Sequence, residues 1–288
     1  MKDIIVIVGP TGIGKTKCSI ELAKRLDAEI INGDSVSIYK KLNIGSAKPT
    51  IEERENIPHH LLDIKEPCEE YTVYDYQKDV RRTIEEIISK NKRVIIVGGT
   101  GFYIKAALYE YDFDEEKSKK DYSHLTEEEI IERIKEYNIK KIPIGNRRRL
   151  ERLLNKCEDG QTITYHKDHL LYPVTVIGLT VDREVLYKRI NTRVDEMFQK
   201  GLVEEVENLK NEYQTSRVLN SAIGYKEFYD YLYGNKSLDE VKEEMKQNSR
   251  RFAKRQYTFF KNQFPTNWVE VNINHFDKTI EEVEKIIK

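Results

Sequence analysis

Short apolar runs alternate with stretches of helical periodicity in the first third of this chain. Residues Ile4–Val8 are all branched aliphatic, which is typical of a strand buried on both faces of a sheet. Apolar residues then recur at the spacing of an amphipathic helix, at Ile20, Leu22, Ala23 and Leu26. Strands separated by helices predict a doubly wound parallel α/β sheet with helices on both faces and ligands at the carboxyl ends of the strands. Further elements are expected at Ala28–Ile31 (strand), Asp75–Ser89 (helix) and Arg93–Val97 (strand).

The pattern changes between Tyr111 and Leu154, where apolar runs become sparse and the charge density rises. Narrow apolar stripes predict helices at Thr126–Tyr137 and Arg147–Asn155. We interpret residues 111–155 as a helical insertion in an α/β core formed by residues 1–110 and 156–288. In the second part of the core we expect strands at Val174–Val181 and Trp268–Val271, helices at Arg183–Gln199, Val203–Tyr213, Ser221–Tyr233 and Leu238–Asn262, and a terminal helix.

The segment after the first strand carries candidate phosphate chemistry. Its residues, Gly9-Pro10-Thr11-Gly12-Ile13-Gly14-Lys15-Thr16, fit the phosphate-binding loop pattern G-x-x-x-x-G-K-[ST] and lie between a predicted strand and a predicted helix. The glycines allow backbone N–H groups to face an anion, Lys15 can reach phosphate oxygens, and the Thr16 hydroxyl can ligate Mg²⁺. Kinases, NTPases and transferases all use this loop, so it predicts a P-loop-type fold and a phosphate ligand without naming the reaction.

Two other segments also follow predicted strands directly and should meet the phosphate-binding loop in one crevice. Asp34, in Gly33-Asp34-Ser35, is either a carboxylate beside the phosphate site or a turn-capping residue. Thr100, in Gly98-Gly99-Thr100-Gly101, offers a hydroxyl where the backbone can approach a ligand closely, or lies in a tight strand-to-helix turn. The residues alone leave both alternatives open.

Composition narrows the class of protein only in part. The net charge of −1 is the difference between 49 basic and 50 acidic side chains, so it excludes no class of ligand. Cys18, Cys68 and Cys157 lack the spacing of a metal site or the even number of a disulfide scaffold. The first strand begins too early for a signal peptide, and no apolar stretch approaches membrane length, so we expect a cytoplasmic protein.

The basic residues are clustered. Lys140–Arg152 contains six basic side chains against one acidic residue, and Lys246–Lys261 contains six with none. Arg250 and Lys254 lie opposite the apolar stripe of their predicted helix, which suits either a solvated surface or a polyanion, and the two clusters together favour a polyanion. Arg193 lies at the edge of an apolar helix stripe, so it should pair with either an acidic side chain or a phosphate.

One stretch, GDSVSIYKKLNIGSAKPT (Gly33–Thr50), is far more selective than the phosphate-binding loop. Six more accompany it: GPTGIGKT (Gly9–Thr16), PHHLLDI (Pro58–Ile64), VGGTGFYIKA (Val97–Ala106), RRRLERLL (Arg147–Leu154), IGYKE (Ile223–Glu227) and AKRQ–T–F (Ala253–Phe259). On these residues the chain resembles the family of bacterial tRNA dimethylallyltransferases, or IPP transferases, which modify the adenosine 3′ of the anticodon.

The resemblance implies transfer of a dimethylallyl group from dimethylallyl diphosphate to the N6 amine of that adenosine. The phosphate-binding loop would hold the diphosphate, and Lys15, Arg193 and a Mg²⁺ ion on Thr16 would neutralise it as it leaves. Asp34 would accept a proton from the amine, and Thr100 would hold the amine or the bridging oxygen in line.

The resemblance also implies that the adenine is flipped out of the anticodon stem-loop of tRNA into the crevice. We expect the protein to be a monomer.

The sequence departs from the family pattern in one place: residues 112–126 are shorter than the usual insertion and lack its A-D-P-x-x-R pattern. Residues expected to contact tRNA are Asp34, Ser35, Val36, Ser37, Arg148, Arg149, Leu150, Glu151, Arg152, Gly224, Tyr225, Lys226, Arg250 and Lys254.

Two other functions fit the phosphate-binding loop. A nucleoside or small-molecule kinase would keep the loop but also needs a pocket for the ATP base and arginines over its phosphates. A nucleotide-dependent RNA-binding module would bind RNA without changing its mass. Consumption of ATP or of dimethylallyl diphosphate distinguishes these functions.

Overall fold

The computed structural model describes residues 3–111, 113, 120–139, 142–161 and 169–288. Contacts divide the chain into two compact units, one formed by Met1–Tyr109 with Leu170–Lys288 and one formed by Glu110–His169. An antiparallel bridge between Tyr109 and Leu170 joins the points where the chain leaves and re-enters the larger unit, which explains why the smaller unit extends past residue 155. Lys140 and Lys141 of the first basic cluster, and most of residues 112–126 before Lys120, lie outside the described residues.

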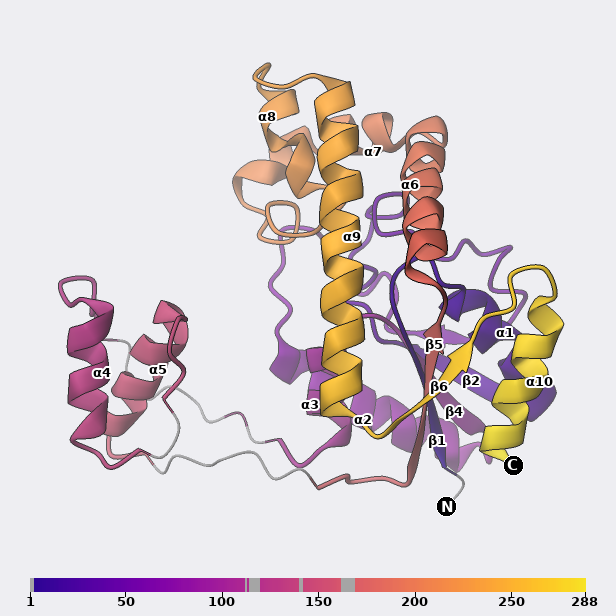
Figure 1. Cartoon of the computed structure of the whole chain (residues 1–288), viewed down its shortest axis with the longest axis horizontal. Coiled ribbons are helices and arrows are strands. Elements are labelled where there is room, and N and C mark those ends of the chain that lie inside the picture. The colour runs from indigo at the N-terminus through magenta and orange to yellow at the C-terminus, as the bar shows by residue number, and fades with distance from the viewer. Residues whose placement is uncertain (1–2, 112, 114–119, 140–141, 162–168) are drawn as a thin grey trace. The chain divides into compact units, whose positions relative to one another are not determined.

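The larger unit is built on one parallel sheet (Figure 1). In the described part of the chain the sheet has six strands in the order β3-β2-β4-β1-β5-β6, and every pair is parallel. The predicted doubly wound parallel α/β fold is therefore confirmed. The strands are β1 (Ile4–Val8), β2 (Ala28–Asn32), β3 (His59–His60), β4 (Arg93–Val97), β5 (Val174–Thr180) and β6 (Thr266–Glu270).

Helices cover both faces of the sheet because β1 is apolar at every position. Ile5 and Ile7 pack in one core cluster with α1 (Lys15–Leu26) and α10 (Phe276–Ile287). Val6 and Val8 pack in another with α2 (Val73–Ser89) and α3 (Gly101–Leu108). Alternate residues of one strand thus supply two cores, as expected from the period of a strand. The other helices of this unit are α6 (Arg183–Gln199), α7 (Leu202–Asn208), α8 (Tyr229–Leu232) and α9 (Leu238–Gln263).

The predicted helix at Ser221–Tyr233 is wrong. Its first half consists of turns, followed by a 3₁₀ turn at Lys226–Phe228 and the single-turn helix α8. Gly224 has φ +99°, and a Cβ there would lie 2.5 Å from the carbonyl oxygen of Gly45. The close approach of these two backbones interrupts the helix, although the apolar spacing is helical. Similarly, the helix predicted at Val203–Tyr213 is α7 followed by a 3₁₀ helix at Lys210–Gln214.

The smaller unit contains α4 (Glu127–Lys135) and α5 (Arg147–Glu158). Thr126 caps α4 by accepting a hydrogen bond from the Glu129 N–H, which sets the start of the helix. Ile130 and Ile134 of α4 pack against Leu150 and Leu154 of α5, and all four are fully buried. The side chain of Leu150 therefore cannot contact tRNA, and its assignment as a tRNA contact is corrected. No helix among the described residues of either unit has the length and apolar composition needed to cross a membrane.

Candidate active site

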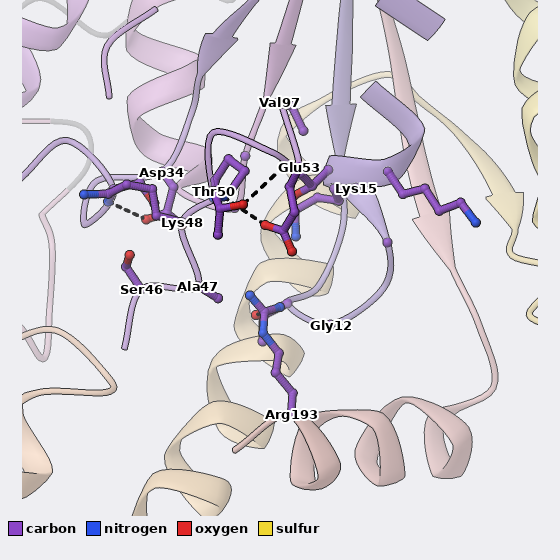
Figure 2. A pocket seen from close by; sticks show the side chains of 18 of the residues that line it. Gly12, Lys15, Asp34, Ser46, Ala47, Lys48, Thr50, Glu53, Val97 and Arg193 are labelled. Carbon is purple, nitrogen blue, oxygen red and sulfur yellow. Dashed lines mark hydrogen bonds between the residues drawn. The ribbon is translucent and has the colours of Figure 1, made fainter. Parts of the chain in front are cut away.

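Three loops at the carboxyl ends of β1, β2 and β4 line one cavity of about 930 Å³ in the larger unit (Figure 2). They are the phosphate-binding loop, the segment containing Asp34, and the Gly98–Gly99 segment. A Cβ on Gly98 would lie only 2.1 Å from the carbonyl carbon of Gly33. The glycines are therefore required because the backbones after β2 and β4 touch, and the close approach anticipated at Gly98 occurs between two loops of the protein.

The phosphate-binding loop adopts backbone angles that glycine permits. Gly9, Gly12 and Gly14 have φ values of +141°, +79° and +107°. A side chain at Gly9 would also collide with the Leu179 carbonyl oxygen, which lies 2.7 Å from the position of a Cβ. Lys15 folds back over the loop and donates to the Pro10 carbonyl oxygen at 2.9 Å. The loop thus has the backbone conformation typical of a phosphate-binding loop, and its lysine is positioned by the loop itself.

The charge of Lys15 depends on its surroundings. Burial of the ammonium group and, to a smaller extent, the nearby charge of Arg193 lower the pKa of Lys15 to about 7, while Asp34 opposes this shift. Two cations that disfavour each other beside a glycine-rich loop are stabilised by a bound anion, which interacts with both.

Arg193 reaches the phosphate-binding loop from α6 (Figure 2). Its guanidinium donates to the Thr11 hydroxyl at 3.3 Å and makes no ion pair with any described carboxylate. Of the two expected partners, no acidic side chain among the described residues lies within ion-pair distance. Burial lowers the pKa of Arg193, and the carboxylate of Asp34 opposes this shift. Arg189, one helical turn earlier, donates to the Gly12 carbonyl oxygen at 2.9 Å. Arg189 is not among the residues that the sequence predicted for the site, although its i, i+4 spacing from Arg193 places both on one helix face.

Asp34 combines the two functions that the sequence left as alternatives. One carboxylate oxygen, Oδ1, accepts from the N–H groups of Val36 at 2.9 Å and Ser37 at 3.4 Å, as in an Asx turn. The other oxygen, Oδ2, accepts no hydrogen bond from a described residue, and Asp34 lines the cavity. The turn fixes the carboxylate through Oδ1 and leaves Oδ2 for a ligand.

Thr100 is tied to the Asp34 loop. Its hydroxyl oxygen accepts from the Ser35 N–H at 3.0 Å and donates to the Ser35 hydroxyl at 3.2 Å. Thr100 also lies directly before α3, so it occupies the strand-to-helix turn that was the alternative interpretation. The structure therefore brings Asp34, Thr100, Lys15 and Arg193 to the same end of the sheet.

The expected tRNA contacts differ in accessibility. Arg148, Arg149 and Arg152 are exposed on α5, whereas Glu151 pairs with Arg147 at 2.8 Å. Tyr225 is fully buried, and its hydroxyl donates to Glu205 at 2.8 Å, so its side chain cannot contact tRNA and that assignment is corrected.

The basic face of α9 is partly used within the protein. Arg250 is half-buried and donates to the Asn191 side-chain oxygen at 2.6 Å. Lys246 pairs with Asp195 of α6 at 2.9 Å, a compensating acid that the local sequence did not reveal. Lys254 is exposed, so it is the better of the two named α9 residues for binding a polyanion.

Comparisons with known proteins agree along the whole chain. The family model described as IPP transferase matches residues 37–263. The tRNA dimethylallyltransferase of Anoxybacillus flavithermus is 45% identical over 296 residues, covering 98% of this chain and 95% of that protein. The enzyme of the same name from Geobacillus thermodenitrificans is 45% identical over 303 residues, covering 99% and 96%.

Solved structures show the same likeness. The tRNA isopentenylpyrophosphate transferase of Bacillus halodurans is 38% identical, with a TM-score of 0.79, and the match covers 100% of this chain and 96% of that one. A eukaryotic dimethylallyltransferase acting on tRNA is 27% identical, with a TM-score of 0.77, covering 99% and 78%. On sequence and structure together, this chain belongs to the IPP transferase family.

Proposed function

We propose that this protein transfers the dimethylallyl group of dimethylallyl diphosphate to the exocyclic N6 amine of the adenosine 3′ of the anticodon in tRNA. The observation that carries the proposal is that one cavity is lined by a cationic anion cradle, with Lys15 and Arg193, and by the carboxylate of Asp34. The cations can stabilise a leaving diphosphate, and the carboxylate can accept the proton of a reacting amine. The identities of the transferred group, a prenyl group, and of its acceptor, tRNA, are inferred from the names of the relatives.

In the proposed reaction the amine nitrogen attacks the first carbon of the allyl group as the carbon–oxygen bond to the diphosphate breaks. The electron pair of that bond passes to the departing oxygen, where Lys15, Arg193 and the loop N–H groups stabilise the growing negative charge. The proton lost from the amine passes to Asp34 Oδ2. Because the lone pair of the adenine amine is delocalised into the ring, positioning by Asp34 and Thr100 contributes much of the rate.

Magnesium fits this site as a partner of the diphosphate. The described residues contain no group of three or more histidine, cysteine, aspartate or glutamate side chains arranged for a metal. Mg²⁺ needs no such cage, since it keeps several waters and binds through one or two protein oxygens together with substrate phosphates. The Thr16 hydroxyl lines the cavity directly after Lys15 and suits that role. When bound there, Mg²⁺ would add positive charge against the leaving diphosphate.

The tRNA is proposed to lie against the exposed cations of α5 and of α9, which bind phosphates without reading sequence. Replacing Lys254 with glutamate is expected to raise the KM for tRNA severalfold and leave that for dimethylallyl diphosphate unchanged. Each lost phosphate contact should flatten the plot of log affinity against log salt by about 0.7–0.9. The measurement is tRNA affinity across a salt series. The control is Lys278→Glu on α10, another exposed lysine. Equal slopes and affinities in all three proteins would show that Lys254 is only solvated.

The reaction itself is tested by incubating the purified protein with Mg²⁺, dimethylallyl diphosphate and an anticodon stem-loop RNA with adenosine 3′ of the anticodon. We expect the RNA to gain the mass of one dimethylallyl group and an equal amount of diphosphate to be released. An RNA with guanosine at that position should not react. Consumption of ATP with no change in the RNA would favour a kinase, and RNA binding without either reaction would favour a binding module.

A further inference from the structure

Gln256 of α9 is a buried polar side chain that the proposed reaction does not use. It belongs to the AKRQ–T–F stretch, and the residue is 4% exposed. Its amide oxygen accepts from the Thr11 N–H at 3.0 Å, and its amide nitrogen donates to the Gly99 carbonyl oxygen at 3.0 Å. Thr11 lies in the phosphate-binding loop, and Gly99 directly precedes Thr100. One side chain therefore bonds both loops.

The bridge is located where the sheet no longer holds the loops together. Strands β1 and β4 are paired up to Ile7 and Val97, and the Gly98 N–H still donates to the Ile7 carbonyl oxygen at 3.2 Å. Beyond that bond, the described residues show no backbone hydrogen bond between the two loops. Gln256 is the next connection between them, since its amide supplies the acceptor for one loop and the donor for the other.

The glycines on either side of Thr100 are in close contact with the same helix, α9. A Cβ on Gly99 would lie 2.1 Å from the amide nitrogen of Gln256, and a Cβ on Gly101 would lie 2.3 Å from the Phe259 ring. Gln256 and Phe259 are three residues apart and share one face of α9. Helix α9 thus packs directly on both neighbours of Thr100, which is a tertiary reason for the glycines on either side of it.

We propose that Gln256 is a positioning residue that keeps the diphosphate cradle in register with Thr100 and the Asp34 loop. The proposal rests on the proposed function, in which the phosphate-binding loop holds the leaving group and Thr100 aligns the reacting atoms. Thr11 is held from two sides, by Gln256 at its N–H and by Arg193 at its hydroxyl. Thr100 is held through Gly99 and through Ser35. Gln256 therefore sets the spacing between the two loops through its amide hydrogen bonds, without supplying a reacting group.

Gln256→Met tests this role, because methionine has a similar length but neither donates nor accepts as an amide does. Since a misplacement of about 1 Å can cost 10²-fold, we expect kcat to fall by about 10- to 100-fold. The KM values for both substrates and the affinity for inorganic diphosphate should stay within about threefold of wild type, because each loop keeps its own ligand contacts. The control is Gln263→Met, the same change at an exposed position of α9. A kcat close to wild type overturns the proposal, as does a loss confined to KM and diphosphate affinity.

Gln256→Glu provides a second test that does not depend on the first variant folding. A protonated carboxyl can replace the amide in both hydrogen bonds, whereas the ionised form repels the Gly99 carbonyl oxygen. Lys15 and Arg193, which line the same cavity, favour ionisation, while burial and Asp34 oppose it. The ratio of kcat in this variant to kcat in wild type should therefore rise about tenfold or more as the pH is lowered from about 8.5 to 5.5, because a larger fraction of the introduced carboxyl is protonated.

Dividing by the wild-type rate at each pH removes from the comparison the titration of every group that both proteins share, including Lys15. A flat ratio in the glutamate variant, if the methionine variant does not fold, overturns the proposal. Wild-type protein is assayed in parallel, so an inactive wild type refutes the proposed function, whereas an active wild type with active variants refutes only the role of Gln256.

Discussion

Asp34→Asn is expected to lower turnover by about 10²–10⁴-fold while both substrates still bind. Asparagine has the same shape and can still accept from the Val36 N–H through its oxygen, so the turn that fixes the side chain is preserved. What the variant loses is the charged carboxylate that lines the cavity and is proposed to take the proton from the amine. The measurement is kcat and KM for both substrates, with melting temperature as a check on the fold.

The matched control is Asp182→Asn. Asp182 makes the same type of turn, accepting from the N–H two residues later at 2.8 Å, but it is exposed at the start of α6. Because asparagine and aspartate cap helices about equally well, this control should keep both stability and activity. If Asp34→Asn turns over within about threefold of wild type, Asp34 only shapes its loop and another group accepts the proton.

Arg193→Ala should weaken the binding of diphosphate and also slow the chemical step, by about 10²–10³-fold in kcat. The reason is that negative charge accumulates on the leaving group in the transition state, so a cation facing it stabilises that state more than bound substrate. Lys15→Ala should behave in the same way. The measurement is single-turnover rate together with the affinity for inorganic diphosphate, which retains the leaving group and lacks the reacting carbon.

Arg183→Ala is the control for a lost arginine on the same helix, because Arg183 is exposed and its guanidinium packs 5.1 Å from the ring centre of Tyr187. Arg183→Ala should leave the single-turnover rate and the affinity for inorganic diphosphate unchanged. Normal diphosphate affinity and normal turnover in Arg193→Ala would mean that its hydrogen bond to Thr11 only braces the loop. A lowered melting temperature with unchanged kcat would support that structural role.

Elements whose apolar pattern is strong and local were predicted closely. The strand Arg93–Val97 and the helix Arg183–Gln199 have the bounds that periodicity predicts, because each buries its stripe against a neighbour without interruption. The two-residue strand β3 was missed since it is too short to show a period. The segment Ser221–Tyr233 has a helical period, but its first half is folded as turns, because contact with Gly45 outweighs local preference there.

The sequence by itself determined the phosphate-binding loop, the acidic turn after the second strand and the hydroxyl after the fourth. Each depends on residues that are neighbours in the chain, and a parallel sheet brings its strand ends to one edge. The tertiary structure alone decided which side chains serve these loops. Gln256 is 245 residues from Thr11 in the chain, and Arg193 is 182 residues from it. Packing between different elements also decided that Leu150 and Tyr225 are buried and that Lys246 pairs with Asp195. A local period shows which face of a helix is apolar, but it does not show which element packs against that face.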